Sequence, residues 1–304
     1  MRTILVTGAQ GFIGRHISRA AALRGDHVVG IGLGEWAEEE WRSWGLSAWY
    51  ELELTLDNVL RCAGTPDVVF HCAGSASVGL SVEDPAQDFR STVETTLELL
   101  EFLRTAAPRT ALVYPSSGAV YGRAKPLPIN EDAPLEPISP YGVHKKIAED
   151  LCRSYGRSYG VRVSIVRIFS AYGVGLRKQL LWDACTKASR GDASFGGTGR
   201  ETRDWVNVED VARLMLIAGD HADNSTPTVN CAAGQGVEVK SILATLLQAL
   251  GTNLQPEFSG SARLGDPEQV AGDPSRAVAW GWAPKRTWQD GVAEYARWFR
   301  ETAR

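Results

Sequence analysis

The chain has 304 residues and a mass of 33.0 kDa, enough for one large hydrophobic core or for a large domain and a smaller one. Its 44% hydrophobic and 22% charged residues are typical of an ordinary soluble globular protein. The formal net charge of -4 gives no electrostatic reason to expect a nucleic acid or an anionic membrane as partner. Any anionic ligand must therefore be held by a few local groups.

Five cysteines are scattered along the chain, and none belongs to a Cys-x-x-Cys motif. The five histidines are not paired with Cys or carboxylates at metal-ligand spacing, so we expect buried thiols in a reducing compartment and no metal site. Met1-Arg2 leads directly into the apolar run Ile4-Leu5-Val6, and no later run approaches the length of a membrane span. The expected location is the cytoplasm.

A glycine-rich turn follows the first predicted strand, residues 3–7, and precedes a segment with helical apolar spacing, residues 12–24. Glycines in that position allow a tight turn and bring backbone N–H groups close to a pyrophosphate at the helix N-terminus. The turn therefore predicts dinucleotide binding, with a plain tight turn as the alternative. The residues expected at the cofactor are Gly8, Gln10, Gly11, Phe12, Ile13 and Gly14.

The end of the second predicted strand, residues 27–31, should carry an acid that holds the adenosine ribose of NAD. The segment Gly32-Leu33-Gly34 stands there instead, and Glu35 is the nearest carboxylate. Arg15 could meet the 2′-phosphate of NADP, although an exposed helix arginine would look the same in the sequence. The pattern leaves NAD or NADP open, with a slight preference for NADP.

The next segments continue the alternation of helices and strands. Residues 36–49 contain four tryptophans among glutamates and predict an amphipathic helix. Residues 48–54 predict a third strand, whose end at Glu53-Leu54 would lie near an adenine. A fourth strand runs into the small-residue loop Cys72-Ala73-Gly74, where a bulky side chain would block a cofactor. We expect these loop residues to bind the cofactor as well.

A long helix over residues 85–107 and an apolar strand over residues 110–114 follow. Strands and helices that alternate with short connections predict an α/β fold with a Rossmann-type, doubly wound parallel sheet. Such sheets bind ligands at the carboxyl ends of their strands. Ser117 follows one strand and Tyr141 opens the next helix, so the fold can bring both side chains over one cleft.

Tyr141 and Lys145 share one face of the helix that Ser139-Pro140 opens, because they lie four residues apart. A phenol with a pKa of about 10 is a poor acid or base at neutral pH, but an ammonium beside it stabilises the phenolate. The same spacing also occurs by chance on solvated helices. The pair therefore gains meaning only together with other motifs.

These motifs do occur together. The glycine turn, the loop at 72–74, Ser116-Ser117 and Tyr141-x-x-x-Lys145 have the order and spacing of the extended short-chain dehydrogenase/reductase family. The chain resembles the nucleotide-sugar epimerases and reductases of this family over nearly its whole length. Residues 71–82 are particularly similar to those of UDP-galactose 4-epimerases.

The resemblance implies three catalytic residues. Tyr141 would exchange a proton with a sugar hydroxyl or keto oxygen, and Lys145 would lower the tyrosine pKa and bind the nicotinamide ribose. Ser117 would hydrogen-bond the reacting oxygen, with a serine that only caps the strand end as the alternative. Family 4,6-dehydratases carry Asp-Glu directly after this position, whereas this chain has Gly118-Ala119, so we do not expect elimination.

The resemblance also implies a substrate-binding set. Ser170 stands where the family commonly has an Asn that contacts the phosphates, so the usual substrate pose is less secure. Arg203 would meet a phosphate or ribose and Arg263 would clamp the diphosphate, with surface arginines as the alternative. The complete set is Ser77, Ser117, Tyr121, Ser170, Arg203 and Arg263.

We expect residues 1–170 to form the NAD(P)-binding domain and residues 171–304 to form mainly the substrate-binding portion, interleaved with returns to the sheet. The family also implies a homodimer formed by the helices at 85–107 and 141–155, although intramolecular packing would give the same apolar stripes. The predicted partner is a nucleotide-diphosphate sugar.

The predicted reaction is reduction of a nucleotide-diphosphate 4-keto sugar. The alternative is a 4-epimerase that retains tightly bound NAD. A regulator that binds the cofactor without catalysis is less favoured, because all three catalytic residues are present.

Overall fold

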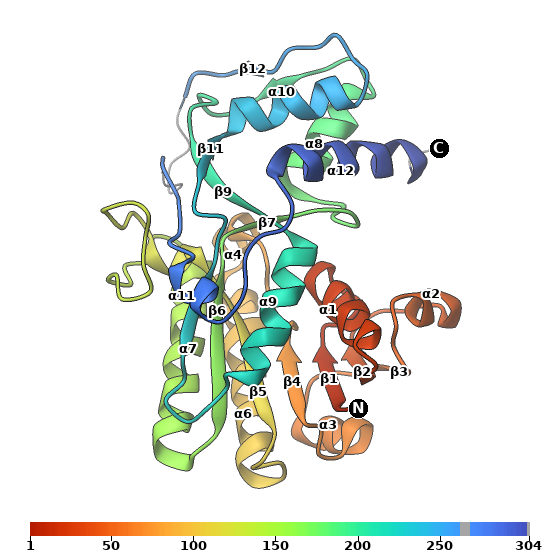
Figure 1. Cartoon of the computed structure of the whole chain (residues 1–304), viewed down its shortest axis with the longest axis vertical. Helices are drawn as coiled ribbons and strands as arrows, with labels where there is room; N and C mark the ends of the chain where they lie inside the picture. Colours follow the sequence, from red (N-terminus) through yellow and green to blue (C-terminus); the bar gives the residue numbers. More distant parts are fainter. Residues whose placement is uncertain (262–267, 303–304) are drawn as a thin grey trace.

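The computed structural model describes residues 1–261 and 268–302. A seven-stranded sheet, parallel throughout, forms the larger lobe (Figure 1), with the strand order β10-β6-β5-β4-β1-β2-β3. This arrangement confirms the predicted Rossmann-type α/β fold. The strands are β1 (Thr3–Thr7), β2 (His27–Gly32), β3 (Ala48–Glu51), β4 (Val68–His71), β5 (Ala111–Ser117), β6 (Arg162–Ile168) and β10 (Thr228–Cys231).

Both faces of this sheet are covered because its strands are apolar on both sides. In β1, Ile4 and Val6 belong to the core on one face and Leu5 to the core on the other, and all three are fully buried. One face packs against α1 (Phe12–Leu23) and α9 (Val208–Asp220). The helices on the opposite face are α3 (Leu56–Ala63), α6 (Thr95–Thr105) and α7 (Pro140–Tyr159).

The long helix predicted over residues 85–107 is divided. It consists of α5 (Pro85–Phe89), a π-helical turn (Arg90–Glu94) and α6, and the short helix α4 (Val78–Glu83) precedes it. π-Helical turns are rare and often lie at functional sites. This turn lies against the loop after β4, residues 72–74, since a Cβ on Gly74 would come 3.2 Å from the Ser91 carbonyl oxygen.

The tryptophan-rich segment does not form the single helix predicted over residues 36–49. Only α2 (Glu38–Ser43) is helical, and Gly45, with φ +84°, follows it in the left-handed region. The tryptophan rings pack on one another and on α1 instead: Trp36 and Trp49 meet edge-to-face at 5.2 Å. Strand β3 also ends at Glu51, three residues earlier than predicted.

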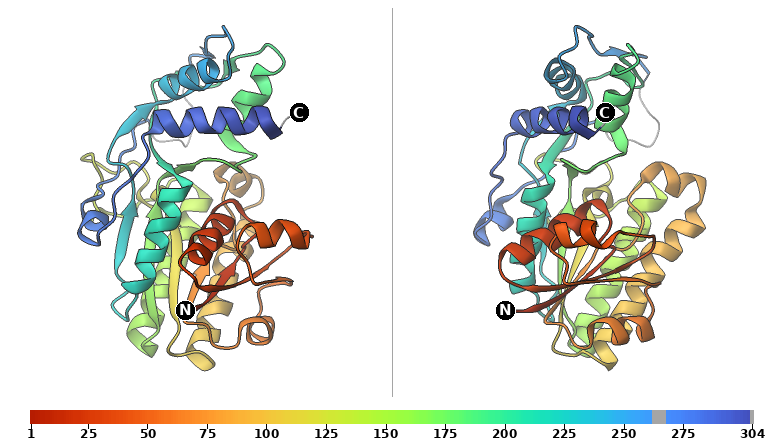
Figure 2. Two further views of the ribbon diagram at one scale, coloured as in Figure 1. Left: turned by 45° about the vertical axis from the view of Figure 1, so that its right-hand side comes forward. Right: turned by 90° about the vertical axis from the view of Figure 1, so that its right-hand side faces the viewer.

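The smaller lobe lies above the carboxyl ends of the large sheet (Figures 1 and 2). It has a three-stranded sheet of β7 (Ser170–Tyr172), β9 (Thr202–Asn207) and β11 (Gly236–Glu238), and a pair of β8 (Ser194–Phe195) and β12 (Glu257–Phe258). Three helices share a separate hydrophobic core with these strands. They are α8 (Gln179–Ala188), α10 (Val239–Ala249) and α12 (Trp288–Thr302).

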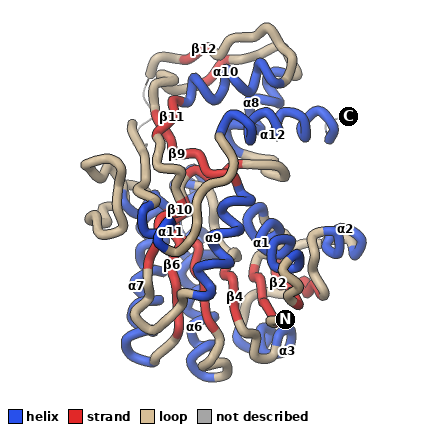
Figure 3. The backbone as a smooth tube through the Cα atoms, in the orientation of Figure 1, coloured by secondary structure: helices blue, strands red, loops and turns tan. Residues whose placement is uncertain are grey.

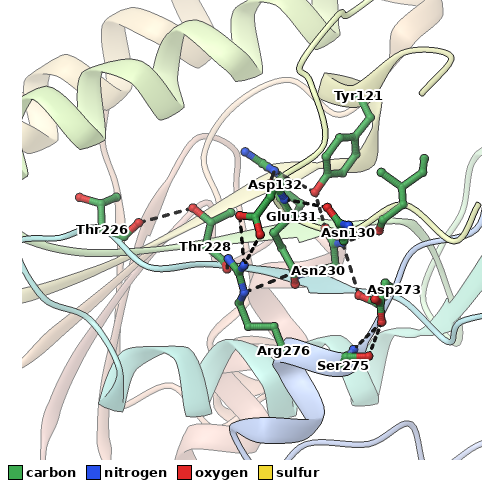
Figure 4. Close-up of polar contacts among 12 residues, drawn as sticks. Tyr121, Asn130, Glu131, Asp132, Thr226, Thr228, Asn230, Asp273, Ser275 and Arg276 are labelled. Atoms are coloured by element: carbon green, nitrogen blue, oxygen red, sulfur yellow. Dashed lines mark hydrogen bonds and ion pairs between the residues drawn. The ribbon is translucent and has the colours of Figure 1, made fainter. Parts of the chain in front are cut away.

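The chain crosses between the lobes more than once. After β9 it returns to the large sheet through α9 and β10, and α11 (Ser275–Ala279) lies beside β10. A long loop between β5 and α7, drawn in tan in Figure 3, is tied to these returning elements. Asn230 of β10 donates to the Ile129 carbonyl oxygen at 2.9 Å, and Arg276 of α11 pairs with Asp132 at 3.2 Å (Figure 4).

None of the helices within the described residues is both long and apolar enough to cross a membrane.

Candidate active site

A cavity of about 670 Å³ lies between the carboxyl ends of the sheet strands and the smaller lobe. The large lobe contributes the start of α1, the loop after β4, the end of β5 and the first turn of α7. The smaller lobe contributes polar and charged side chains, among them Lys178, Glu201, Arg203 and Glu268. The cavity is therefore placed where parallel sheets bind their ligands.

Tyr141 and Lys145 both line this cavity, and so does Ser117. Helix α7 begins as its sequence predicts, with Pro140 in its first turn and the Ser139 hydroxyl accepting a hydrogen bond from the Gly142 N–H at 3.2 Å. This start brings Tyr141 and Lys145 to one side of the helix. The structure thus brings the three predicted catalytic side chains together.

Lys145 contacts the end of β5 and lies near the Tyr141 ring. Its Nζ donates to the Pro115 carbonyl oxygen at 3.1 Å, and it lies 5.9 Å from the centre of the Tyr141 ring. Burial lowers the pKa of Lys145 to about 8, because an ammonium loses its water shell there. The neutral amine of Lys145 is therefore reached at a lower pH than in an exposed lysine.

Burial raises the pKa of Tyr141 to about 12, and a hydrogen bond with Ser117 offsets only part of this increase. The sequence predicts the opposite direction, a phenol whose pKa Lys145 lowers. That prediction is wrong for this structure because desolvation of the phenolate outweighs the polar contacts. The Ser117 hydroxyl also accepts a hydrogen bond from the Ala119 N–H at 3.2 Å, so the capping role is present and the catalytic role stays a prediction.

The backbone of the glycine turn packs so closely that side chains would not fit at Gly8 and Gly14. Gly8 has φ +63°, and a Cβ there would come 2.6 Å from the Ala73 nitrogen, while a Cβ on Gly14 would overlap the Gly8 carbonyl oxygen. Gly11 precedes α1 without a side-chain cap, so the first N–H groups of the helix are available at the cavity. This cradle fits the pyrophosphate of a dinucleotide.

A buried hydrogen-bond chain supports the cofactor loop from below. Thr7 Oγ1 accepts from the Ala73 N–H at 3.1 Å and lies 2.9 Å from His71 Nδ1. His71 Nε2 lies 3.2 Å from Thr96 Oγ1, whose own proton goes to the Thr92 carbonyl oxygen. Burial lowers the pKa of His71 to about 3, so the ring is neutral and carries its proton on Nε2. No sequence motif marks this chain of contacts.

Arg15 does not face a 2′-phosphate. Its Nε donates to the Gln10 carbonyl oxygen at 3.1 Å, and the guanidinium lies 5.7 Å from the Trp36 ring and 5.3 Å from the Trp44 ring. The Gln10 side chain in turn donates to the Glu35 carbonyl oxygen at 2.7 Å. Arg15, the residue on which the preference for NADP rests, is thus engaged in contacts within the protein.

Two residues predicted near the adenine lie outside the cavity lining. Glu53 is exposed and its carbonyl oxygen accepts a hydrogen bond from Asn58, while Leu54 packs against the core beneath the sheet. The loop residues Cys72, Ala73 and Gly74 line the cavity, as do Phe12 and Ile13 of the glycine turn.

The predicted substrate-binding residues divide into three groups. Ser77, Ser170 and Arg203 line the cavity, and Arg203 Nη1 donates to the Thr202 carbonyl oxygen at 2.8 Å. Ser77 also caps α4. Arg263 lies outside the described residues.

Tyr121 forms the third group, because it is fully buried and absent from the cavity lining. Its hydroxyl donates to Asn230 Oδ1 at 2.7 Å and accepts from Arg167 at 2.8 Å (Figure 4). The structure therefore gives Tyr121 a supporting position beneath the site.

Further cavity residues on the smaller lobe have no counterpart among the predicted ones. Lys178, Gln179, Glu201 and Glu268 stand where the regular alternation of strands and helices breaks down, so no periodic signal marks them. Within residues 1–261 and 268–302, no group of three His, Cys, Asp or Glu side chains is arranged to hold a metal ion.

Known proteins are similar to this chain in sequence and in fold. The NAD dependent epimerase/dehydratase family matches residues 4–232. The chain is 32% identical over 323 residues to the UDP-glucose 4-epimerase of Azospirillum brasilense, which covers 96% of this chain and 90% of that protein.

Solved structures give the same result. A UDP-glucose 4-epimerase from Thermotoga maritima, determined with UDP-glucose, superposes with a TM-score of 0.90 at 28% identity, over 99% of this chain and 100% of that one. The UDP-glucose 4-epimerase of Thermus thermophilus, in complex with NAD, gives a TM-score of 0.88 at 29% identity, over 99% of each chain. NAD is the cofactor named in the family description and in the Thermus complex, so the slight preference for NADP is not supported.

Proposed function

Since the chain belongs to the NAD-dependent epimerase/dehydratase family, we propose that it is an NAD-dependent 4-epimerase of nucleotide-diphosphate sugars. The observation that carries this proposal is the meeting of Tyr141, Lys145 and Ser117 in one cavity with the glycine turn. The sequence favours a 4-keto reductase and keeps the epimerase as the alternative. The similar proteins named above are 4-epimerases, which supports the alternative better.

Side chains of this protein would remove the proton of the sugar hydroxyl and later return it. Tyr141 would accept the proton from the hydroxyl on C4 as a phenolate, and because burial disfavours the phenolate, the Lys145 ammonium would have to stabilise it. Ser117 donates a hydrogen bond to the same oxygen while the C4–O group of the sugar becomes a carbonyl. NAD, when bound, supplies the reversible oxidation and reduction of that carbon. After the sugar turns its other face, Tyr141 returns the proton to the oxygen.

The cofactor would lie along the large lobe. The first N–H groups of α1, from Phe12 to Gly14, would bind the pyrophosphate, and Cys72, Ala73 and Gly74 would flank the nicotinamide half. Lys145 would also reach the nicotinamide ribose. NAD is the proposed cofactor because Arg15 is engaged by Gln10 and the tryptophan rings.

Elimination of water is disfavoured at this site. Gly118 and Ala119, directly after Ser117, carry no acid or base, and a Cβ on Gly118 would lie 3.3 Å from the Phe169 ring. A larger ionisable side chain there would require the ring to move. The site is thus equipped for chemistry at a single carbinol carbon.

The smaller lobe would bind the rest of the substrate. We assign the nucleotide and diphosphate to the wall that Ser170, Lys178 and Arg203 share, with Ser77 facing it from the large lobe. Arg263 remains a predicted diphosphate ligand. The expected domains, 1–170 for the cofactor and 171–304 mainly for the substrate, remain part of the proposal.

A homodimer remains part of the proposal. Apolar side chains stay exposed on the helices where the dimer is expected, namely Phe89, Leu97 and Val143. Sedimentation of the purified protein at several concentrations would test this expectation.

Proton NMR of the anomeric region tests the reaction directly. The purified protein is incubated with UDP-glucose and NAD, and UDP-galactose is expected to accumulate towards the same ratio that is reached from UDP-galactose. In deuterium oxide C4 should keep its hydrogen, because a 4-epimerase returns the hydrogen it removed. Consumption of NADPH on a 4-keto sugar, with no interconversion of the two sugars, would replace the epimerase by the reductase.

A further inference from the structure

Asp204 is a buried carboxylate at the junction of the two lobes. It lies on β9 between two residues that line the cavity, Arg203 and Trp205, and it is fully buried. Its own side chain does not line the cavity, because neighbouring side chains of a strand point to opposite faces. The proposed mechanism gives this carboxylate no role.

Backbone N–H groups from two other segments compensate the charge of Asp204. Its Oδ1 accepts from the Ala233 N–H at 2.6 Å, and its Oδ2 accepts from the Gly234 N–H at 3.0 Å and from the Gly272 N–H at 3.1 Å. A buried carboxylate is costly unless such donors surround it, and hydrogen bonds to a charged acceptor are the stronger ones. Burial raises the pKa of Asp204 to about 6 although these N–H groups act against the increase, so the carboxylate is ionised at pH 8.

The first of these segments is the turn after β10, residues 232–235, at the carboxyl end of the large sheet. Gly234 has φ +83°, a conformation that favours glycine, and the turn presents two successive N–H groups to one carboxylate. After the turn the chain enters β11, which pairs with β9. Asp204 thus ties the smaller-lobe sheet directly to the end of a large-sheet strand.

The second segment, residues 268–273, forms part of the cavity wall through Glu268. It lies along β9, two residues from Asp204. The Thr202 N–H donates to the Glu268 carbonyl oxygen at 2.9 Å, and the Val270 N–H donates to Thr202 Oγ1 at 3.3 Å. Asp204 is therefore the charged attachment of a segment that neutral hydrogen bonds also hold.

The same segment contacts the large lobe. The Ile129 N–H, in the loop between β5 and α7, donates to the Ala271 carbonyl oxygen at 2.8 Å, and the Asp273 N–H donates to the Ile129 carbonyl oxygen at 2.8 Å. A Cβ on Gly272 would lie 2.5 Å from the Phe169 ring, which lines the cavity, so the segment packs directly against that ring. The segment therefore joins both lobes beside the cavity.

We propose that Asp204 is a positioning residue for substrate binding, which clamps residues 232–235 and 268–273 to β9 and so holds the smaller-lobe wall of the cavity in place relative to the large lobe. This role rests on the proposed function, because that wall is assigned to the nucleotide and diphosphate of the substrate. Loss of the clamp should weaken nucleotide binding. It should leave the cofactor in place, because the large lobe would bind it.

Hydrogen exchange measures the clamp without substrate. Asp204→Asn keeps the side-chain shape, but its amide nitrogen cannot accept a hydrogen bond from a backbone N–H. With NAD present at pH 8, peptides that cover residues 232–235 and 270–273 should exchange about tenfold faster than in the wild type. Asp192→Asn is the matched control and should leave both segments unchanged, because Asp192 Oδ1 accepts the Ser194 N–H at 2.8 Å on an exposed turn outside the cavity.

Calorimetry with UDP tests the positioning role. In the presence of NAD, the Kd of UDP should rise by about tenfold in Asp204→Asn, while the Kd of NAD stays unchanged. A merely structural loss would weaken both ligands. Equal weakening of UDP and NAD would therefore contradict the proposal, and so would faster exchange with unchanged UDP binding.

A second variant covers the case in which Asp204→Asn does not fold. Thr202→Val keeps the side-chain shape and removes only the hydroxyl that accepts from the Val270 N–H. It should speed exchange at residues 268–273 but not at residues 232–235, and it should raise the Kd of UDP by roughly threefold. Unchanged UDP binding in spite of faster exchange would count against the clamp.

The clamp and the proposed function can fail separately. Unchanged exchange at both segments in folded Asp204→Asn overturns the clamp even if the protein interconverts the two sugars. A failed 4-epimerase assay leaves the exchange result valid. A wild type that binds no UDP would refute the proposed substrate, and with it the positioning role, whatever the exchange shows.

Discussion

The two walls of the cavity are built in different ways. On the large lobe the chemical groups stand on regular, buried elements: Ser117 ends a seven-residue strand and Tyr141 opens a 20-residue helix. On the smaller lobe the lining comes from the short strands β7 and β9 and from the loops and helix ends beside them. Under the proposed function, the fold would hold the reacting groups on long regular elements and leave substrate recognition mainly to short strands and the loops beside them.

This contrast explains what each wall reveals. Reaction chemistry requires a few residue types at fixed spacing on fixed elements, so it leaves a motif in the sequence. Under the proposed function, recognition of a base and a sugar would use cavity residues such as Lys178 and Glu268, which share no sequence period. The sequence therefore predicts the class of reaction from the residues of the large lobe. It does not predict the identity of the substrate from the residues of the smaller lobe.

The largest expected effect comes from the wall that the large lobe forms. Tyr141→Phe removes the proton-transfer group and should lower kcat by about 10² to 10⁴ with the substrate KM nearly unchanged. The matched control is Tyr155→Phe on the same helix, where the hydroxyl contacts Glu101 at 2.5 Å outside the cavity. Steady-state kinetics on both variants decide the matter. Comparable activity in the two would remove Tyr141 from the mechanism.

The second-largest effect is expected from the buried ion pair of Arg167 and Glu149. Arg167→Met leaves Glu149 buried without its main partner and should reduce the free energy of unfolding by about 3–5 kcal/mol. Urea unfolding followed by circular dichroism measures the change. Lys146→Met breaks the exposed pair with Asp150 and should change stability by less than about 1 kcal/mol. Equal effects for the two variants would mean that burial does not govern these pairs.

A substitution in the cavity lining of the smaller lobe should have a smaller effect, on the substrate KM and not on kcat. Arg203→Ala should raise the substrate KM by roughly tenfold and change kcat much less, because its contact forms equally in the ground and transition states. Arg200→Ala, at an exposed position near the start of β9, is the control and should leave KM unchanged. A fall in kcat without a change in KM would place Arg203 in the chemistry and weaken the contrast between the walls.

The smallest expected effect is a slope in stability with pH. Burial lowers the pKa of Lys145 to about 8 in the folded protein from its ordinary value of 10.5. Between these values the unfolded chain binds more protons than the folded one, so this group makes stability rise with pH. The wild type should gain stability relative to Lys145→Met between about pH 8 and 10 in urea titrations. A constant difference would mean that the pKa of Lys145 is not lowered.

The sequence predicts the sheet and the catalytic side chains because both depend on local patterns. Apolar runs at β1, β4, β5 and β6 identify the strands, and the Ser-Pro start of α7 places Tyr141. The predicted helix at 36–49 fails because the tryptophans pack around Arg15, a tertiary contact without a sequence period. The role given to Tyr121 fails for a similar reason, since its partners Asn230 and Arg167 come from distant strands.

Electrostatics is the other part that the sequence cannot supply. The spacing of Tyr141 and Lys145 predicts a lowered phenol pKa, but the depth of burial reverses the direction. The pair of Asp88 and His144 shows the same limit, because no motif marks it and only the packing of α5 on α7 brings the two side chains together. Charges act through distance and solvent exposure, which the fold decides.

The return of the chain to the large sheet makes the cofactor-binding half dependent on residues far beyond position 170. Strand β10 supplies one edge of that sheet, and α9 covers the face on which Val6 and Val166 lie. A fragment ending at residue 170 would expose this face to water. The two lobes are therefore not separable modules, and a recombination that exchanges the substrate lobe must carry α9 and β10 with the parent sheet.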